Sequence, residues 1–78
     1  MNRERRKALT ELNEQFETLS TQLEELKDAE EESLENMPES FQDGERGEKM
    51  REAVEQLETA MQLIEELTEA ITSAKGEG

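Results

Sequence analysis

The residues from Leu23 to Glu35 form the densest run of ionisable side chains in the sequence. This stretch, LEELKDAEEESLE, holds seven acids against one cation, Lys27. On a helix, carboxylates four residues apart lie roughly 6 Å from one another, comparable to the spacing of phosphates along a nucleic-acid strand. The acids that would form such rows are Glu24, Asp28, Glu31 and Glu35, with Glu25 and Glu32 beside them. The pattern predicts a rigid acidic surface able to occupy the basic groove of a nucleic-acid-binding protein; the simpler interpretation is a solvated face that keeps a small bundle soluble.

Other kinds of chemistry find little support in the residue types. The sequence has no histidine, cysteine, tyrosine or tryptophan, and its serines and threonines lack an evident base. Acid/base catalysis by a carboxyl group needs a pocket that shifts its pKa, and a narrow bundle of Leu, Ile and Ala offers no obvious one. The acids of DGERGEKMREAVE do not follow the EF-hand pattern. We therefore expect no enzyme activity, no metal site and no cofactor.

Two heptad repeats must position the acids. In each half of the chain, apolar residues alternate at spacings of three and four, as in the a and d positions of a coiled coil. These positions are Leu9, Leu12, Phe16, Leu19, Leu23 and Leu26, then Met50, Ala53, Leu57, Ala60, Ile64, Leu67, Ile71 and Ala74. The repeats predict one domain over 1–78, with helices over about 3–36 and 45–75 and a frayed tail over 76–78.

A short segment, NMPESFQDGER, interrupts the repeat and predicts a turn over 37–44. Pro38 disfavours helical geometry at the preceding residue and stops the first helix. Asn2 is placed to cap the start of the first helix, and Asp43 is the better cap candidate for the second. Neighbouring helices joined by so short a connection are antiparallel.

The turn does not need an aromatic residue, yet it carries Phe41. Together with Met37 and Arg46, this side chain has two interpretations. The three residues either fold back and cap the end of the bundle, or they present an apolar knob to a partner.

The residues that flank the two apolar seams predict the assembly. Most of them are small, neutral or apolar, unlike the charged pairs of a two-stranded coiled coil. A chain of 78 residues without disulfides rarely builds a sufficient core by itself, and one hairpin would leave Val54, Met61 and Leu63 exposed. We therefore predict an all-α, coiled-coil-like antiparallel helical hairpin that forms a homodimeric four-helix bundle through these three residues. An elongated monomeric hairpin is the alternative.

The charge balance limits the partners. The formal net charge is −13, and because residues 1–7 carry a local +3, the remainder carries −16. Such a surface repels nucleic acid and anionic membranes, and the sequence shows neither a membrane-spanning run nor the apolar region of a secretory signal. We expect a cytoplasmic protein with a basic or nucleic-acid-binding protein partner, without direct nucleic-acid or membrane binding.

The basic start, RERRK at residues 3–7, opposes the dipole of the helix that it begins. An antiparallel hairpin brings it toward Glu65, Glu66 and Glu69 near the end of the second helix, so pairing with these acids is the structural explanation. A contact to RNA, to phosphate or to a membrane is the alternative.

The order of these pieces resembles a group of short, acidic helical-hairpin proteins of unknown function from phages and mobile elements of bacteria. The residues that carry the resemblance are NRERRKAL, DAEEESLENMPESFQDGER and MREAVEQLETAMQLIEELTEAI, nearly the whole chain. The resemblance implies a mobile-element origin and a bacterial host cell. It brings no settled activity, although many small acidic phage proteins inhibit host nucleases or other defence proteins, some by imitating DNA.

Two function classes follow. The first is a non-enzymatic inhibitor or nucleic-acid mimic that binds a basic host protein through the acidic helix faces. The second is a structural or assembly coiled-coil protein whose apolar flanks bind a partner helix. Salt separates them, since only the first depends on exposed charges.

Overall fold

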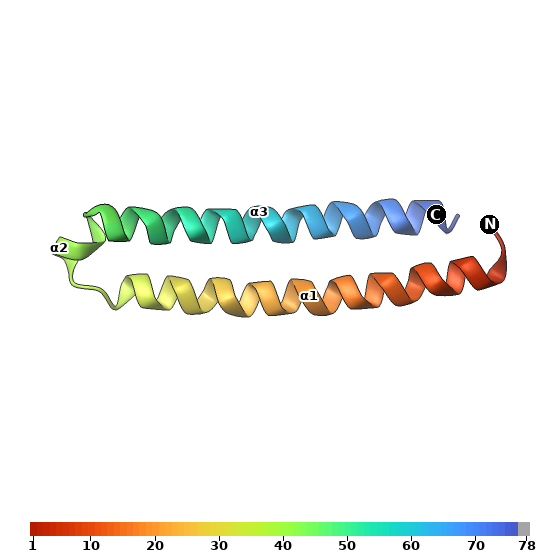
Figure 1. Cartoon of the computed structure of the whole chain (residues 1–78), viewed down its shortest axis with the longest axis horizontal. Coiled ribbons are helices and arrows are strands. Elements are labelled where there is room, and N and C mark those ends of the chain that lie inside the picture. Colours follow the sequence, from red (N-terminus) through yellow and green to blue (C-terminus); the bar gives the residue numbers. More distant parts are fainter. Residues whose placement is uncertain (77–78) are drawn as a thin grey trace.

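The chain forms two long helices that pack side by side in opposite directions (Figure 1). A computed structural model describes residues 1–76. Helix α1 spans Arg3–Glu35, the single turn α2 spans Glu39–Gln42, and α3 spans Glu45–Ala74. The rod measures 58 × 15 × 15 Å, with α2 at one end and the start of α1 and the end of α3 near the other. The predicted all-α antiparallel hairpin is confirmed; residues 77 and 78 of the predicted tail lie outside the described part of the chain.

The ends of α1 follow from its capping residues. The side chain of Asn2 accepts a hydrogen bond of 2.8 Å from the backbone N–H of Arg5, which confirms the predicted N-cap. The helix ends at Glu35, three residues before Pro38, and α2 begins directly after this proline.

The start of α3 corrects one prediction. Gly44, not Asp43, is the N-cap residue, and it offers no side-chain cap. Asp43 instead closes α2, because its backbone N–H donates to the carbonyl of Glu39 at 3.1 Å. The prediction was wrong because the short turn of helix, which uses Asp43 for its own end, was not foreseen.

Hydrogen bonds hold α2 against both long helices. The side-chain amide of Gln42 donates to the carbonyl of Met37 at 2.7 Å and to that of Glu35, the last residue of α1, at 3.4 Å. The guanidinium of Arg51, in α3, donates to the carbonyl of Gln42 at 2.8 Å. Gly47 lets α3 approach this point closely, since a Cβ there would overlap the Gln42 backbone.

The seam between α1 and α3 uses a different set of heptad positions from the predicted one. On α1 the less exposed residues include Leu9, Asn13, Phe16, Ser20, Leu23, Lys27 and Leu34; on α3 they include Met50, Val54, Leu57, Met61, Ile64, Thr68 and Ile71. The spacing of three and four is as expected. However, on α1 one of the two rows has moved by one residue, whereas on α3 Ala53 and Ala60 stay half-buried beside Val54 and Met61, and Thr68 replaces Leu67.

The shifted row exposes leucines that the sequence placed in the seam. Leu12, Leu19 and Leu26 are 42%, 46% and 61% exposed. The prediction failed because the neutral stripe on each helix is wider than one neighbour can cover. Val54 and Met61 lie half-buried beside the smaller alanines at 53 and 60, so the seam on α3 removes more apolar surface from water than the predicted rows alone.

Candidate functional site

The first candidate surface is the acidic ridge, which we define as Glu24, Glu25, Asp28, Glu31, Glu32 and Glu35. All six lie on α1, and all except the half-buried Glu31 are exposed. The 33-residue helix keeps the carboxylates at fixed positions along the rod. The structure therefore brings the predicted acids together on one helix.

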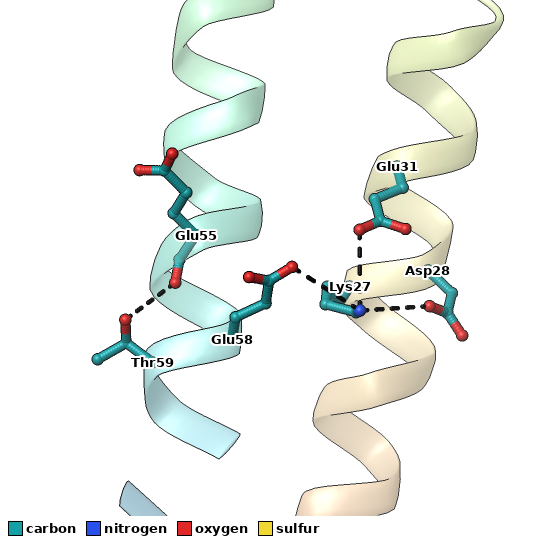
Figure 2. A network of polar contacts seen from close by, with 6 residues as sticks. All are labelled: Lys27, Asp28, Glu31, Glu55, Glu58 and Thr59. Atoms are coloured by element: carbon teal, nitrogen blue, oxygen red, sulfur yellow. Dashed lines mark hydrogen bonds and ion pairs between the residues drawn. The ribbon is translucent and has the colours of Figure 1, made fainter. Parts of the chain in front are cut away.

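One cation touches this ridge. The Nζ of Lys27 lies 3.7 Å from Glu31 and 3.9 Å from Asp28 (Figure 2). It also lies 3.9 Å from Glu58 of α3, so a single ammonium group joins carboxylates of both helices. Within residues 1–76, the other four ridge acids have no cation within ion-pair distance, which leaves most of the ridge uncompensated.

Glu58 is an addition that the sequence argument missed. Its heptad position on α3 matches that of Glu31 on α1, and the antiparallel register brings both to the same side of the hairpin. The signal that could have found it is the lysine in the seam, because a half-buried ammonium needs a carboxylate from the neighbouring helix.

The second candidate surface is the loop end. Met37, Phe41 and Arg46 line one open hollow of about 500 Å³, together with Ser33, Asn36 and Pro38. Phe41 is 57% exposed, whereas Met37 is half-buried. The structure thus brings the three predicted loop residues together, with the aromatic ring largely in solvent.

The third candidate surface is apolar and runs along one side of the rod. We define the apolar face by Leu12, Leu19 and Leu26 of α1 and Ala53, Ala60, Leu63 and Leu67 of α3. Leu63 is 59% exposed, as the sequence predicted. Val54 and Met61 do not join it, since both are half-buried and Met61 borders a hollow between the two helices. The expectation that the hairpin leaves Val54 and Met61 exposed is wrong, because these half-buried side chains lie at the seam of the hairpin itself. Their part in an oligomer contact stays a prediction.

The two stripes of the apolar face lie on the same side of the hairpin. Glu17 and Glu65 stand on the opposite flank of their helices from these stripes, and both line one hollow between α1 and α3. The Lys27–Glu58 pair marks that same flank. Since the polar flanks share one side of the rod, the apolar stripes share the other.

The basic start does not pair as predicted. In the described residues, no acid lies within ion-pair distance of Arg3, Arg5, Arg6 or Lys7. The register explains this, because the amide of Asn13 donates to Thr72 at 3.2 Å. Residues 3–7 therefore lie beyond Thr72 along the rod, two turns or more past Glu65 and Glu66.

Residues 1–76 contain no cluster of three acids arranged to hold a metal ion. No helix in this range is both long and apolar enough to cross a bilayer. The comparisons found no matching protein-family model, no similar curated protein and no similar solved structure. The three surfaces must therefore be interpreted from their own chemistry.

Proposed function

We propose that this protein is a non-enzymatic protein-binding module that works as a homodimer and inhibits a basic, nucleic-acid-binding protein through its acidic ridge. The observation that supports the proposal most is the exposure of Glu24, Glu25 and Glu32 with no cation of residues 1–76 within ion-pair distance. Rows of carboxylates on a rigid helix present negative charge at intervals similar to those of a phosphate backbone. A basic groove would bind this surface without distorting it.

The setting of this activity is part of the same proposal. Following the resemblance to acidic proteins of phages and mobile elements, we propose that the protein acts in the cytoplasm of a bacterial host, where nucleases and other defence proteins carry basic grooves. In this proposal the surface competes with nucleic acid for such a groove and carries out no chemical step.

The test uses the protein as bait against a bacterial lysate at low and high salt, followed by affinity measurement with the captured protein. We expect affinity to fall at least about tenfold across that range, because the contact is between exposed charges. Affinity that does not change with salt would contradict the mimic.

Two triple variants locate the contact. Glu24→Gln, Glu25→Gln and Glu32→Gln together remove exposed ridge charges without breaking the ion pairs of Lys27. The matched control carries Glu55→Gln, Glu66→Gln and Glu69→Gln, which remove the same charge from exposed positions of α3. The ridge variant should lose binding and the control should keep it. Equal losses would mean that net charge, and not the ridge, determines affinity.

The exposed apolar face supports a second candidate, a structural or assembly protein that binds a partner helix. Leu19 and Leu63, 46% and 59% exposed, would be its anchors. In that case Leu19→Ser and Leu63→Ser abolish binding of the captured protein, while salt has little effect. The ridge variant would then bind normally, so the same set of measurements separates the two functions.

A further inference from the structure

The apolar face is free of acids although acids dominate the chain. The residues of this face occupy two positions of each heptad. On α1 these are positions 8, 12, 15, 19, 22, 26, 29 and 33, and on α3 they are positions 49, 53, 56, 60, 63, 67, 70 and 74. None of these positions holds an aspartate or glutamate, and Lys49 is the one charged residue among them, whereas the chain has 22 acids in 78 residues. A solvated face has no physical reason to exclude them, but a face that packs against another protein surface does.

A single hairpin does not bury a hydrophobic core in residues 1–76. No hydrophobic side chain in residues 1–76 is buried, and leucines stay exposed along most of the rod. One face of a rod of 58 × 15 Å covers roughly 870 Å², close to the ~800 Å² per partner of a stable interface. The face is therefore large enough to supply the missing core if a matching surface covers it.

The face is complementary to itself. Leu12 and Leu26 lie seven residues on either side of Leu19. Two copies of α1 laid face to face in opposite directions, with Leu19 against Leu19, place Leu12 of each against Leu26 of the other. On α3, the same two-fold operation places Leu63 against Leu67. A two-fold axis requires such a self-matching pattern.

Charge decides between the two possible orientations. With the loops at opposite ends, Arg5 of one copy comes to the level of Ser33 of the other, and the basic residues 3–7 lie beside the acids of 30–35. These basic residues have no ion-pair partner within the described part of the hairpin. With the loops at one end, residues 3–7 of both copies lie at the same end of the dimer, away from the acids of 30–35.

We infer that a second copy of this chain covers the apolar face, with the loops at opposite ends and Leu19 on the two-fold axis. This inference rests on the homodimer of the proposed function, and it adds the contact face and the orientation. Glu24, Glu25 and Asp28 of each acidic ridge stay accessible, because the contact uses the side of the rod away from Lys27 and Glu58. Glu31, Glu32 and Glu35, at the end of the ridge, lie at the level of residues 3–7 of the other copy.

The mass in solution tests the second copy. Sedimentation equilibrium should give about 18 kDa, twice the 9.0 kDa of the chain, and Leu19→Arg should shift it toward the monomer or unfold the chain. A species of 9 kDa at micromolar concentration overturns the inference. This holds even if the monomer binds a different protein through Leu19 and Leu63. Ridge-dependent binding by such a monomer would leave the inhibitor function standing.

Disulfide trapping tests the face and the orientation, because the natural chain has no cysteine. On mild oxidation, Leu19→Cys should form a covalent dimer, since only the antiparallel arrangement brings two copies of position 19 within the ~6 Å that a disulfide needs between Cα atoms. Arg5→Cys and Ser33→Cys should cross-link when mixed and not separately. Thr21→Cys, on the exposed outer side of α1, is the control that should stay uncrosslinked. A species of 18 kDa without these cross-links overturns the proposed face and orientation and leaves the homodimer intact.

Discussion

Gly47 of α3 packs directly against the backbone of Gln42 in α2. A Cβ built at Gly47 would lie 2.6 Å from the carbonyl carbon of Gln42 and closer still to its oxygen. The same carbonyl accepts a hydrogen bond from Arg51, so the contact fixes how the loop joins α3. The glycine inside the first turns of α3 is thus required by packing, although glycine weakens a helix interior.

Gly47→Ala should therefore destabilise the protein, although alanine favours an exposed helix. We expect the free energy of unfolding to fall by roughly 1–3 kcal/mol, because backbone atoms must move to admit the methyl group. Urea denaturation followed by circular dichroism, at fixed protein concentration, measures the loss. Gly44→Ser is the control: a Cβ there meets only ordinary contacts at 3.5 and 3.7 Å, and serine adds an N-cap. A Gly47→Ala variant as stable as this control would contradict the close approach.

Asn13 is a polar residue in the seam, and it sets the register at a cost. Its amide nitrogen donates to the Thr68 carbonyl at 3.5 Å and to Thr72 at 3.2 Å, while its Oδ1 is buried without a partner among the described residues. Asn13→Leu should raise the free energy of unfolding by roughly 1 kcal/mol, because it removes the unpaired oxygen. Thermal unfolding of the variant beside Asn13→Asp, which places a carboxylate against the Thr68 carbonyl and should lower stability, checks the argument. A loss of stability in Asn13→Leu would show that the two donated hydrogen bonds outweigh the unpaired oxygen.

Lys27 should contribute stability that depends on salt. Its side chain is 21% exposed and lies near carboxylates of both helices, so Lys27→Gln leaves Glu31 and Glu58 without their shared cation. We expect a loss below about 1 kcal/mol at low salt that shrinks as salt is added. Lys49→Gln is the matched control, since Lys49 pairs at 3.4 Å with Glu45 alone and both side chains are largely exposed. Denaturant midpoints at two salt concentrations measure both variants, and a salt-independent loss at Lys27 would point to packing by its aliphatic stem.

Substitution of Phe41 should have little effect on the free energy of unfolding, because the ring is 57% exposed. We expect Phe41→Ser to change the free energy of unfolding by less than about 0.5 kcal/mol. Met37→Ser, at a half-buried position in the same hollow, should cost more, on the order of 1–2 kcal/mol. Equal losses in chemical denaturation would mean that Phe41 caps the bundle end. A silent Phe41 variant that weakens partner binding would identify the loop end as a contact surface.

The heptad spacing was sufficient to predict the hairpin, and the reason is local. Apolar residues at intervals of three and four predict a helix. Pro38 and the residues after it predict that this helix ends there. Asn2 caps α1 because its short polar side chain can accept a hydrogen bond from the backbone N–H of Arg5, three residues ahead. The acidic ridge was predictable on the same grounds, since residues on one helix keep fixed mutual positions whatever the helix packs against.

The rotation of each helix about its axis was decided only by the tertiary structure. Leu19 and Ser20 were both compatible with the seam, because several neighbouring positions of each heptad are uncharged, and the packing of α1 on α3 turned Ser20 inward and Leu19 outward. The register between the helices likewise appears only when Lys27 meets Glu58 and Asn13 meets Thr72. Spacing along one helix determines which residues share a face. The face that is buried depends on the size and shape of side chains on the opposing helix, which the pattern of a single segment does not contain.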